Sequence, residues 1–216
     1  DLIRRKRQRA VHAFSWPLLT AADGSKLGKT TGARVWLDAA KTSPYAFRQH
    51  WMQTPDDAVR SQLLTFSLRP VPELESIAAE HAEAPHRRIG QRTLATDMVS
   101  LVHGAPAAAA AEEAADLLFA TDPTGASTAA FEMLAEEIPT TRMSAADLHD
   151  AVGVLVATGL ASSNGDARRT MDQNAYSVNG VKLTANDQLT EQKLLHGRYL
   201  LLRRGKKLHH LVEILS

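Results

Sequence analysis

Proline residues mark a series of helix starts between residues 43 and 120, and this punctuation constrains the fold more than any other feature of the sequence. A helix tolerates proline in its first turn but not in its interior, so each proline fixes where a helix begins. A serine or threonine directly before the proline adds a capping hydroxyl. Such starts lie at Ser43-Pro44, Thr54-Pro55, Pro72, Pro85 and Pro106. The sequence therefore predicts a domain of short helices over residues 43–120.

Apolar side chains recur at helical spacing inside these predicted helices, which identifies the expected core. The side chains that we expect to be buried are Phe47, Trp51, Val59, Leu63, Leu64, Leu94, Met98 and Leu101, together with Trp36 ahead of the first helix. The fourth helix should stop at His103-Gly104, because glycine suits the left-handed residue that ends a helix. An alanine-rich helix should follow from Pro106 to about Phe119, and a weaker one over about 126–137.

The pattern changes after residue 144, and residues 121–144 are predicted to be a connector. A helix is expected over residues 145–158, and Ser163-Asn164-Gly165-Asp166 forms a capping box for a second, short helix. Asn179-Gly180 between alternating residues is the strongest short signal for a hairpin. A second strand pair is expected over 199–203 and 208–214. Residues 145–216 therefore read as a small α+β domain.

Residues 1–42 do not continue either pattern. A helix with a basic face is expected over 2–13, followed by an irregular segment with a short strand or extended turn at 33–37. The chain starts with Asp1 and without a helix cap, so we expect it to be part of something longer. Two lysines stand three positions apart in the glycine-flanked loop Lys26-Leu27-Gly28-Lys29-Thr30. Their ammonium groups could stabilise charge that develops on a leaving pyrophosphate.

A Walker A loop is an alternative for this segment, since Gly28-Lys29-Thr30 is how that motif ends. The motif needs a glycine five positions before Gly28, but Asp23 stands there and puts a carboxylate where phosphate should lie. A nucleotide-binding P-loop kinase is therefore disfavoured. An exposed basic loop without a ligand stays open on the loop alone.

Charge is segregated although the net charge is only +1. Residues 1–41 hold nine Lys and Arg against three acids, residues 111–149 hold one against eight, and residues 150–216 hold nine against six. This pattern fits a polyanion held at two places, although random surface charge explains it equally well. The chain has no cysteine, which excludes disulfides and thiolate metal sites. It also lacks a membrane-length apolar run, and adjacent strand residues such as His209 and His210 should point to opposite faces rather than chelate a metal.

Taken together, these segments resemble the bacterial tyrosyl-tRNA synthetases over nearly the whole chain. The residues that carry the resemblance, in family order, are Asp1-Leu2-Ile3-Arg4-Arg5, Trp16-Pro17-Leu18-Leu19-Thr20, Asp23 to Thr30 as a KMSKS-like loop, Val35-Trp36-Leu37-Asp38, Thr42 to Phe47 with Trp51, Gln91-Arg92, and Leu101-Val102-His103-Gly104. Leu27 departs mildly from the family form and leaves both lysines in place. Residues 145–216 resemble the S-four RNA-binding domain through Ser163, Ala167-Arg168-Arg169 and Val178-Asn179-Gly180.

The resemblance implies a mostly α protein with a small C-terminal α+β domain. Residues 1–42 would be the end of a class I, Rossmann-type catalytic domain, residues 43–120 the anticodon-binding helices and residues 145–216 the S-four domain. It further implies a cytoplasmic homodimer, without membrane attachment, that uses ATP with Mg²⁺ to activate tyrosine and then charges tRNA(Tyr), with no prosthetic group and no structural metal. The His-x-Gly-His motif of class I synthetases is absent, so the chain alone should not form the adenylate.

The resemblance also assigns residues to sites. Lys26 and Lys29 would be catalytic, and ATP would be bound by Lys26, Leu27, Gly28, Lys29 and Thr30. RNA phosphates would be contacted by Arg168, Arg169, Lys182, Arg203, Arg204, Lys206 and Lys207. Asp56 and Asp57 could accept hydrogen bonds from anticodon bases, although helix capping explains them more simply. A non-catalytic RNA-binding protein with an S-four domain is the alternative function, and the Lys26–Thr30 loop argues against it.

Overall fold

The computed structural model describes residues 2–15, 34–184 and 187–215, and these divide into a unit ending at Arg34 and a unit from Val35 onward. The first unit contains helix α1 (Leu2–Arg7), which buries no side chain. The helix predicted over 2–13 therefore ends much earlier. Four consecutive basic residues close it, and a short helix without a packed face gains little stability in water. The predicted strand or extended turn over 33–37 forms no strand within its described part: residues 34–36 have no regular structure, and bends and turns follow over residues 37–42.

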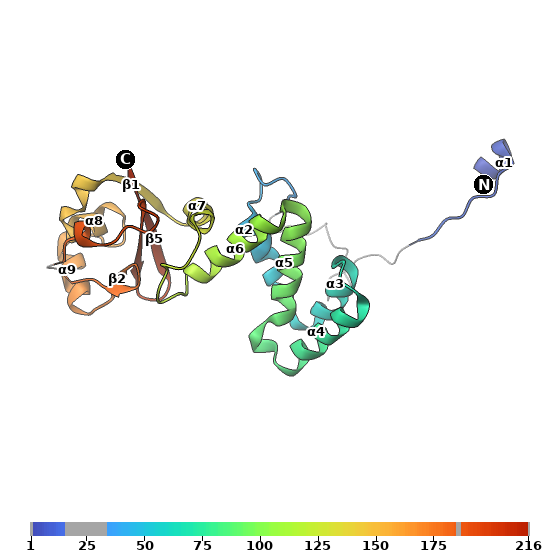
Figure 1. Cartoon of the computed structure of the whole chain (residues 1–216), viewed down its shortest axis with the longest axis horizontal. Coiled ribbons are helices and arrows are strands. Elements are labelled where there is room, and N and C mark those ends of the chain that lie inside the picture. Colours follow the sequence, from blue (N-terminus) through green and yellow to red (C-terminus); the bar gives the residue numbers. More distant parts are fainter. Residues whose placement is uncertain (1, 16–33, 185–186, 216) are drawn as a thin grey trace. The chain divides into compact units, whose positions relative to one another are not determined.

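Five α-helices follow between residues 44 and 117, as the prolines predict (Figure 1). They are α2 (Pro44–Met52), α3 (Val59–Phe66), α4 (Val71–Glu83), α5 (Ile89–His103) and α6 (Ala105–Leu117). The Ser43 hydroxyl accepts from the Ala46 amide at 3.0 Å, which confirms the predicted cap of α2. Gly104 takes φ +89° directly after α5, where a side chain would strain the backbone.

The core of these helices contains most of the predicted residues, including Phe47, Leu63, Leu94 and Met98. The prediction that Leu101 is buried is wrong, since its side chain is 55% exposed. The buried stripe of α5 consists of Leu94, Ala95, Met98 and Val99, and Leu101 lies to one side of it. The prediction that Trp36 is buried is also wrong, because its ring is exposed; the Lys41 ammonium nitrogen lies over this ring, 4.6 Å from its centre.

The predicted cap at Thr54 is not formed. A 3₁₀ turn at Asp56–Ala58 precedes α3, and its cap position is Pro55, which offers no side-chain acceptor. The Thr54 hydroxyl instead donates to Gln62 Oε1 at 2.9 Å, and Asp56 Oδ1 accepts from Gln91 Nε2 at 2.6 Å. The polar groups of this segment therefore tie α3 to α5 rather than capping a helix.

The C-terminal part contains a five-stranded mixed sheet in the order β1-β5-β4-β2-β3. The strands are β1 (Thr140–Ser144), β2 (Tyr176–Val178), β3 (Val181–Lys182), β4 (Tyr199–Arg204) and β5 (Leu208–Leu215). Both predicted strand pairs are confirmed, and Asn179 and Gly180 have φ values of +48° and +84°, as a tight hairpin turn requires. Strand β1 runs parallel to β5 at the edge, and no prediction included it.

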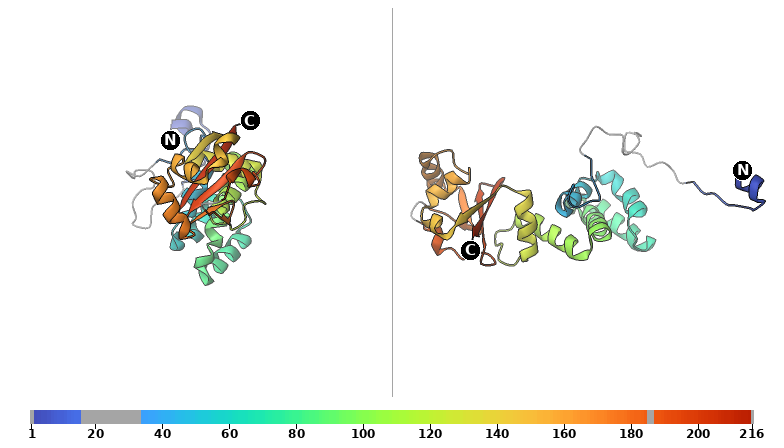
Figure 2. Two further views of the ribbon diagram at one scale, coloured as in Figure 1. Left: turned by 90° about the vertical axis from the view of Figure 1, so that its left-hand side faces the viewer. Right: turned by 90° about the horizontal axis from the view of Figure 1, so that it is seen from above.

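Helices cover both faces of this sheet (Figures 1 and 2). One core cluster joins α8 (Ala151–Ala157) and α9 (Asn164–Asp172) to Leu200, Leu202 and Val212. A second cluster joins α7 (Thr128–Glu137) to Tyr199, Leu201 and Leu211. Alternate residues of β4 and β5 therefore serve opposite faces, as strand geometry dictates. The helix predicted over 145–158 is divided, because Ala145–His149 is a 3₁₀ turn and Asp150 caps α8 through the Val152 amide.

The segment 121–144 is more than the predicted connector. Phe131 and Leu134 of α7 are fully buried against the sheet, and β1 pairs with β5 along its length. Ala114 and Leu117 of α6 lie in the same cluster, so the helical region and the sheet share part of a core. A mostly α chain with a small C-terminal α+β part is nevertheless confirmed. Among the described residues, no helix is long and apolar enough to cross a membrane.

Candidate nucleic-acid interface

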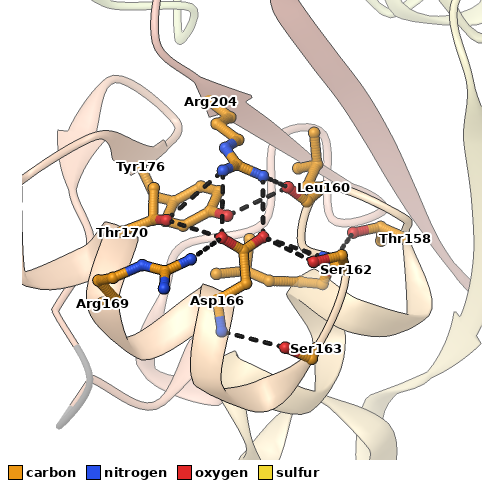
Figure 3. A network of polar contacts seen from close by, with 10 residues as sticks. Thr158, Leu160, Ser162, Ser163, Asp166, Arg169, Thr170, Tyr176 and Arg204 are labelled. Carbon is orange, nitrogen blue, oxygen red and sulfur yellow. Dashed lines mark hydrogen bonds and ion pairs between the residues drawn. The ribbon is translucent and has the colours of Figure 1, made fainter.

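Asp166 organises the start of α9, where the sequence places two candidate RNA-binding arginines (Figure 3). Its carboxylate accepts from the Ser162 amide at 3.0 Å and from Arg204 Nη1 at 3.2 Å on one oxygen. The other oxygen accepts from Arg169 Nη2 at 3.2 Å. The Ser162 hydrogen bond, followed by the Arg204 guanidinium, lowers the pKa of Asp166 to about 2. The carboxylate is therefore ionised at neutral pH and fixes the approach of the chain into α9.

The cap of α9 differs in one detail from the predicted capping box. The Ser163 hydroxyl accepts from the Asp166 amide at 3.2 Å, as predicted. The Asp166 carboxylate, however, accepts from the Ser162 amide, whereas a capping box would have it accept from the Ser163 amide. This shift of one residue leaves the carboxylate facing Arg204 on β4 (Figure 3).

Arg204 is committed to contacts inside the protein. Besides Asp166, its Nη1 donates to the Leu160 carbonyl at 2.6 Å, and its guanidinium carbon lies 5.5 Å from the centre of the Tyr176 ring. The Tyr176 hydroxyl donates to the same carbonyl at 3.1 Å, and burial raises its pKa. These contacts give Arg204 a structural role and weigh against its use as a phosphate contact.

Arg203 is also committed, but on the opposite face of the sheet. Its Nη2 donates to the carbonyl groups of Leu118 and Ala120 at 3.0 Å each and to that of Leu117 at 3.4 Å. The last carbonyl groups of a helix have no partner within the helix. Arg203 therefore caps the C-terminal end of α6, which also weighs against its predicted role in RNA binding.

The remaining five predicted cations are exposed: Arg168, Arg169, Lys182, Lys206 and Lys207. The structure brings the last three to the end of α9. Lys182 Nζ donates to the Asn174 carbonyl at 2.6 Å, and the β4–β5 turn approaches through a hydrogen bond from the Gly205 amide to the Ala175 carbonyl at 2.8 Å. Within the described residues, Arg168 has no hydrogen-bond or ion-pair partner. Exposed cations thus lie on α9 itself and on two hairpins beyond its C-terminal end, and such cations suit contacts to a phosphate backbone.

Comparison with known proteins decides the family. Residues 1–120 match the family model described as tRNA synthetases class I (W and Y), which is more than half of the chain. The chain belongs to this class I tRNA synthetase family. Residues 130–212 match a second model, described as the Tyrosine--tRNA ligase SYY-like C-terminal domain. The resemblance predicted from the sequence is thereby confirmed.

Relatives with the name Tyrosine--tRNA ligase align with nearly the whole of this synthetase chain. That of Kineococcus radiotolerans is 44% identical over 209 residues, which cover 96% of this chain and 49% of that protein. Those of Chromobacterium violaceum and Aeromonas hydrophila are 42% and 41% identical, over 99% and 98% of this chain and 50% of each relative. The chain spans about half the length of the curated relatives it matches.

The prediction that residues 26–30 bind ATP is not tested by the structure. Lys26, Leu27, Gly28, Lys29 and Thr30 lie outside the described residues. Their assignment to ATP therefore stays a prediction.

An ion-pair cluster on β1 and β5 was missed by the sequence analysis. Glu213 is 5% exposed and accepts from Arg142 Nε at 2.9 Å and from Arg198 on its other oxygen. The Arg142 hydrogen bond, above all, lowers the pKa of Glu213. The cluster borders a cavity of ≈ 740 Å³. A glutamate inside the apolar run Leu211–Leu215 was the signal, since a carboxylate in such a strand needs a cationic partner.

The histidine pair behaves as strand geometry predicts. His210 is buried, and its Nε2 lies 2.8 Å from Thr141 Oγ1 of β1, whereas His209 faces the other side of the sheet next to Arg203. In the part of the chain that the structure describes, no group of three or more His, Cys, Asp or Glu residues could hold a metal ion.

Proposed function

We propose that this chain supplies the ATP-loop and tRNA-binding parts of a tyrosine–tRNA ligase. Such an enzyme activates tyrosine with ATP and Mg²⁺ to tyrosyl-adenylate and transfers it to tRNA(Tyr). The observation that carries the proposal is the order of the two family matches, a class I synthetase model over 1–120 and a Tyrosine--tRNA ligase C-terminal model over 130–212. The second match favours tyrosine over tryptophan.

Three further parts of the proposal follow from the family. Residues 1–42 end the catalytic domain, residues 43–120 form the anticodon-binding helices, and residues 145–216 form the S-four domain. The complete enzyme is a cytoplasmic homodimer. A non-catalytic RNA-binding protein would lack a synthetase segment, and the match over residues 1–120 argues against that alternative.

Exposed cations support tRNA binding by the C-terminal domain. We narrow the predicted set to Arg168, Arg169, Lys182, Lys206 and Lys207, because the guanidinium groups of Arg203 and Arg204 are used inside the protein. Arg169 stays in the set because its side chain is 73% exposed although it pairs with Asp166. A cation that neutralises an RNA phosphate releases a bound counterion, so binding should weaken with salt. Each such contact should contribute roughly 0.7–0.9 to the slope of log affinity against log salt concentration.

The test is a salt titration of tRNA(Tyr) binding. Replacing Arg168 and Arg169 together by Ala should lower this slope by about 1.4–1.8, for two lost phosphate contacts. Arg142→Ala is the control, since Arg142 is an exposed arginine of β1, in the segment 121–144 that lies outside both proposed tRNA-binding domains. The control should leave the slope unchanged. An unaltered slope in the double variant would place the phosphate contacts elsewhere.

The ATP loop needs a separate test in the full-length enzyme. The ammonium group of Lys29 is proposed to meet pyrophosphate mainly in the transition state, so it should affect the rate more than the affinity. Lys29→Ala should slow adenylate formation by about 10²–10³-fold, the scale for one preorganised electrostatic donor. Transfer from preformed adenylate should be nearly normal. Weaker ATP binding with an unaltered activation rate, measured by single-turnover kinetics, would contradict this role.

A further inference from the structure

The carboxylate of Asp166 is shared by two arginines that differ in what can reach them (Figure 3). Arg204 donates to both carboxylate oxygens, from Nη1 at 3.2 Å and from Nη2 at 3.4 Å. Arg169 donates from Nη2 at 3.2 Å. The Arg204 side chain is 30% exposed, whereas that of Arg169 is 73% exposed. The carboxylate therefore connects an arginine that is largely covered to one that a ligand can reach.

The position of the Asp166 carboxylate is fixed by the chain around it. The amide and the hydroxyl of Ser162 donate to one oxygen, at 3.0 and 3.2 Å. The Thr170 hydroxyl donates to the other oxygen at 3.3 Å, and the Asp166 side chain is only 12% exposed. Because the acceptor is held in this way, its ion pair keeps the Arg169 guanidinium at a defined place on the surface.

Arg204 decides the net charge of this group. Its Nη1 also donates to the Leu160 carbonyl at 2.6 Å, and its guanidinium carbon lies 5.5 Å from the centre of the Tyr176 ring, so it stays beside the carboxylate. A pair of Asp166 and Arg169 alone would be neutral and would attract a phosphate only weakly. With Arg204 present, two guanidinium groups face one carboxylate, and the positive charge of Arg169 stays available to a phosphate.

Arg169 has donors left for a ligand. A guanidinium carries five N–H groups in a planar fork, and among the described residues only Nη2 of Arg169 has a partner, which is Asp166. Binding through a side chain that is already held loses less conformational entropy. Arg168 is also exposed but has no such partner in the part of the chain that the structure describes. The two adjacent arginines of α9 therefore differ in preorganisation.

We propose that Asp166 is a positioning residue for RNA binding, which holds the guanidinium of Arg169 in place for a backbone phosphate while Arg204 cancels the charge of the carboxylate. Asp166 itself does not touch the RNA. A phosphate is the ligand because its oxygens match the parallel N–H donors of a guanidinium. The proposal rests on the proposed tRNA-binding function and assigns the two adjacent arginines different parts in it.

Two opposing effects follow when the carboxylate is removed. Freeing Arg169 in Asp166→Asn should weaken RNA binding by about 2- to 12-fold, the cost of ordering one flexible side chain. Removing a negative charge roughly 8 Å from a phosphate should strengthen binding by less than about 2-fold at about 0.15 M salt, because water and counterions screen it. The net result should be weaker binding, although a charge that repels RNA has been taken away.

The experiment is a double-mutant cycle on binding of the 216-residue chain to a tRNA(Tyr) transcript at about 0.15 M salt. Asp166→Asn should weaken binding by up to about 10-fold in the wild-type chain and in Arg168→Ala. It should not weaken binding in Arg169→Ala, because the side chain that it positions is already gone. Asp172→Asn is the control, since Asp172 is an exposed carboxylate of the same helix without an ion pair among the described residues. This control should not weaken binding.

A second pair of variants leaves the Asp166 carboxylate in place and so does not depend on the stability of Asp166→Asn. Arg169→Lys should weaken binding, because an ammonium group lacks the fork that reaches a carboxylate and a phosphate together. Arg168→Lys should keep most of the affinity, because a side chain without a fixed partner acts as a point charge. Full affinity in Arg169→Lys would overturn the proposal.

Three results of the cycle would also overturn it. Equal weakening by Asp166→Asn in Arg168→Ala and in Arg169→Ala would mean that Asp166 only stabilises the start of α9. Tighter or unchanged binding in the wild-type background would mean that the carboxylate competes with RNA for Arg169 or has no part in binding. Full affinity in Arg169→Ala would place the phosphate contact elsewhere. A wild-type chain that binds no tRNA would contradict the proposed function itself, which is a separate outcome.

Discussion

The two faces of the C-terminal sheet are built differently, although the same two central strands supply both. The face beneath α8 and α9 is an apolar cluster in which Leu200, Leu202 and Val212 meet helix residues such as Leu155. The face beneath α7 holds an aromatic pair, Phe131 stacked on Tyr199, and carries the buried carboxylate of Glu213 at one edge.

Arg203 and Arg204, adjacent on β4, have different roles because their side chains lie on different faces of the sheet. Arg204 faces α9 and fixes the start of that helix through Asp166, whereas Arg203 faces α6 and α7 and caps the end of α6. The two side chains are neighbours in sequence, but they stabilise opposite ends of helices on opposite faces. A run of basic residues on a strand is therefore not one basic surface, and within the run 203–207 only the side chains of the two turn lysines have no hydrogen-bond or ion-pair partner among the described residues.

The largest expected effect comes from the aromatic pair on the α7 face. Phe131 is fully buried and stacks on Tyr199 with ring centres 5.6 Å apart. Phe131→Ala should lower the free energy of unfolding by about 3–5 kcal/mol. Urea unfolding measures this, with Leu155→Ala reporting on the other face at about 2–5 kcal/mol. A loss below about 1 kcal/mol, the scale of a single buried methylene, would mean that α7 is not part of the folded core.

The two arginines should show a smaller and separable effect. Arg203→Met leaves carbonyl groups at the end of α6 without a partner, which should cost about 1–3 kcal/mol. Hydrogen exchange should then speed up at the amides of Phe119 and Ala120. Arg204→Met should instead speed up exchange near Ser162 and Asp166. Identical exchange patterns in the two variants would contradict the claim that Arg203 and Arg204 stabilise different helices on different faces of the sheet.

Acid should act on the α9 face through Asp166. Its pKa in the folded protein is about 2, below the value of about 3.9 for an unfolded chain. The unfolded state therefore binds this proton first, and the stabilisation is complete above about pH 4 and is lost between about pH 4 and 2. Asp166→Asn should lack this part of the acid transition. A wild-type and a variant with parallel stability curves from pH 5 to 2 would contradict it.

The smallest expected effect concerns one histidine on each face. Burial lowers the pKa of His210, and burial together with the charge of Arg203 lowers that of His209. The unfolded state therefore takes up these protons at a higher pH than the folded state does, so stability should be complete above about pH 6.5 and should fall below that pH. His209→Gln and His210→Gln should each flatten the curve of stability against pH below about pH 6.5. If the Arg203 charge matters, Arg203→Met should reduce the contribution of His209 and not that of His210.

The sequence alone determined the local structure of this protein. Pro44, Gly104 and the Asn179-Gly180 turn fix their backbone conformations through residues within a few positions, so helix starts, a helix end and a hairpin were predicted correctly. Strand alternation was equally local, and it separated His209 from His210 before any partner was known. Arg168, Arg169 and the turn lysines were assigned to RNA by the family resemblance; the structure shows that they are exposed, and their contact with RNA stays a prediction.

Only the tertiary structure decided which polar side chains are available to a ligand. The partners of Arg203 are 83 to 86 residues away and the carboxylate partner of Arg204 is 38 residues away. The edge strand β1 pairs with residues 71 positions later. Such contacts form when two helix ends or strand edges are brought together and their unpaired carbonyl, amide and carboxylate groups must find donors or acceptors. Which arginine donates to which of these groups depends on the face of the sheet on which its side chain lies, and no periodicity in the sequence predicts this pairing.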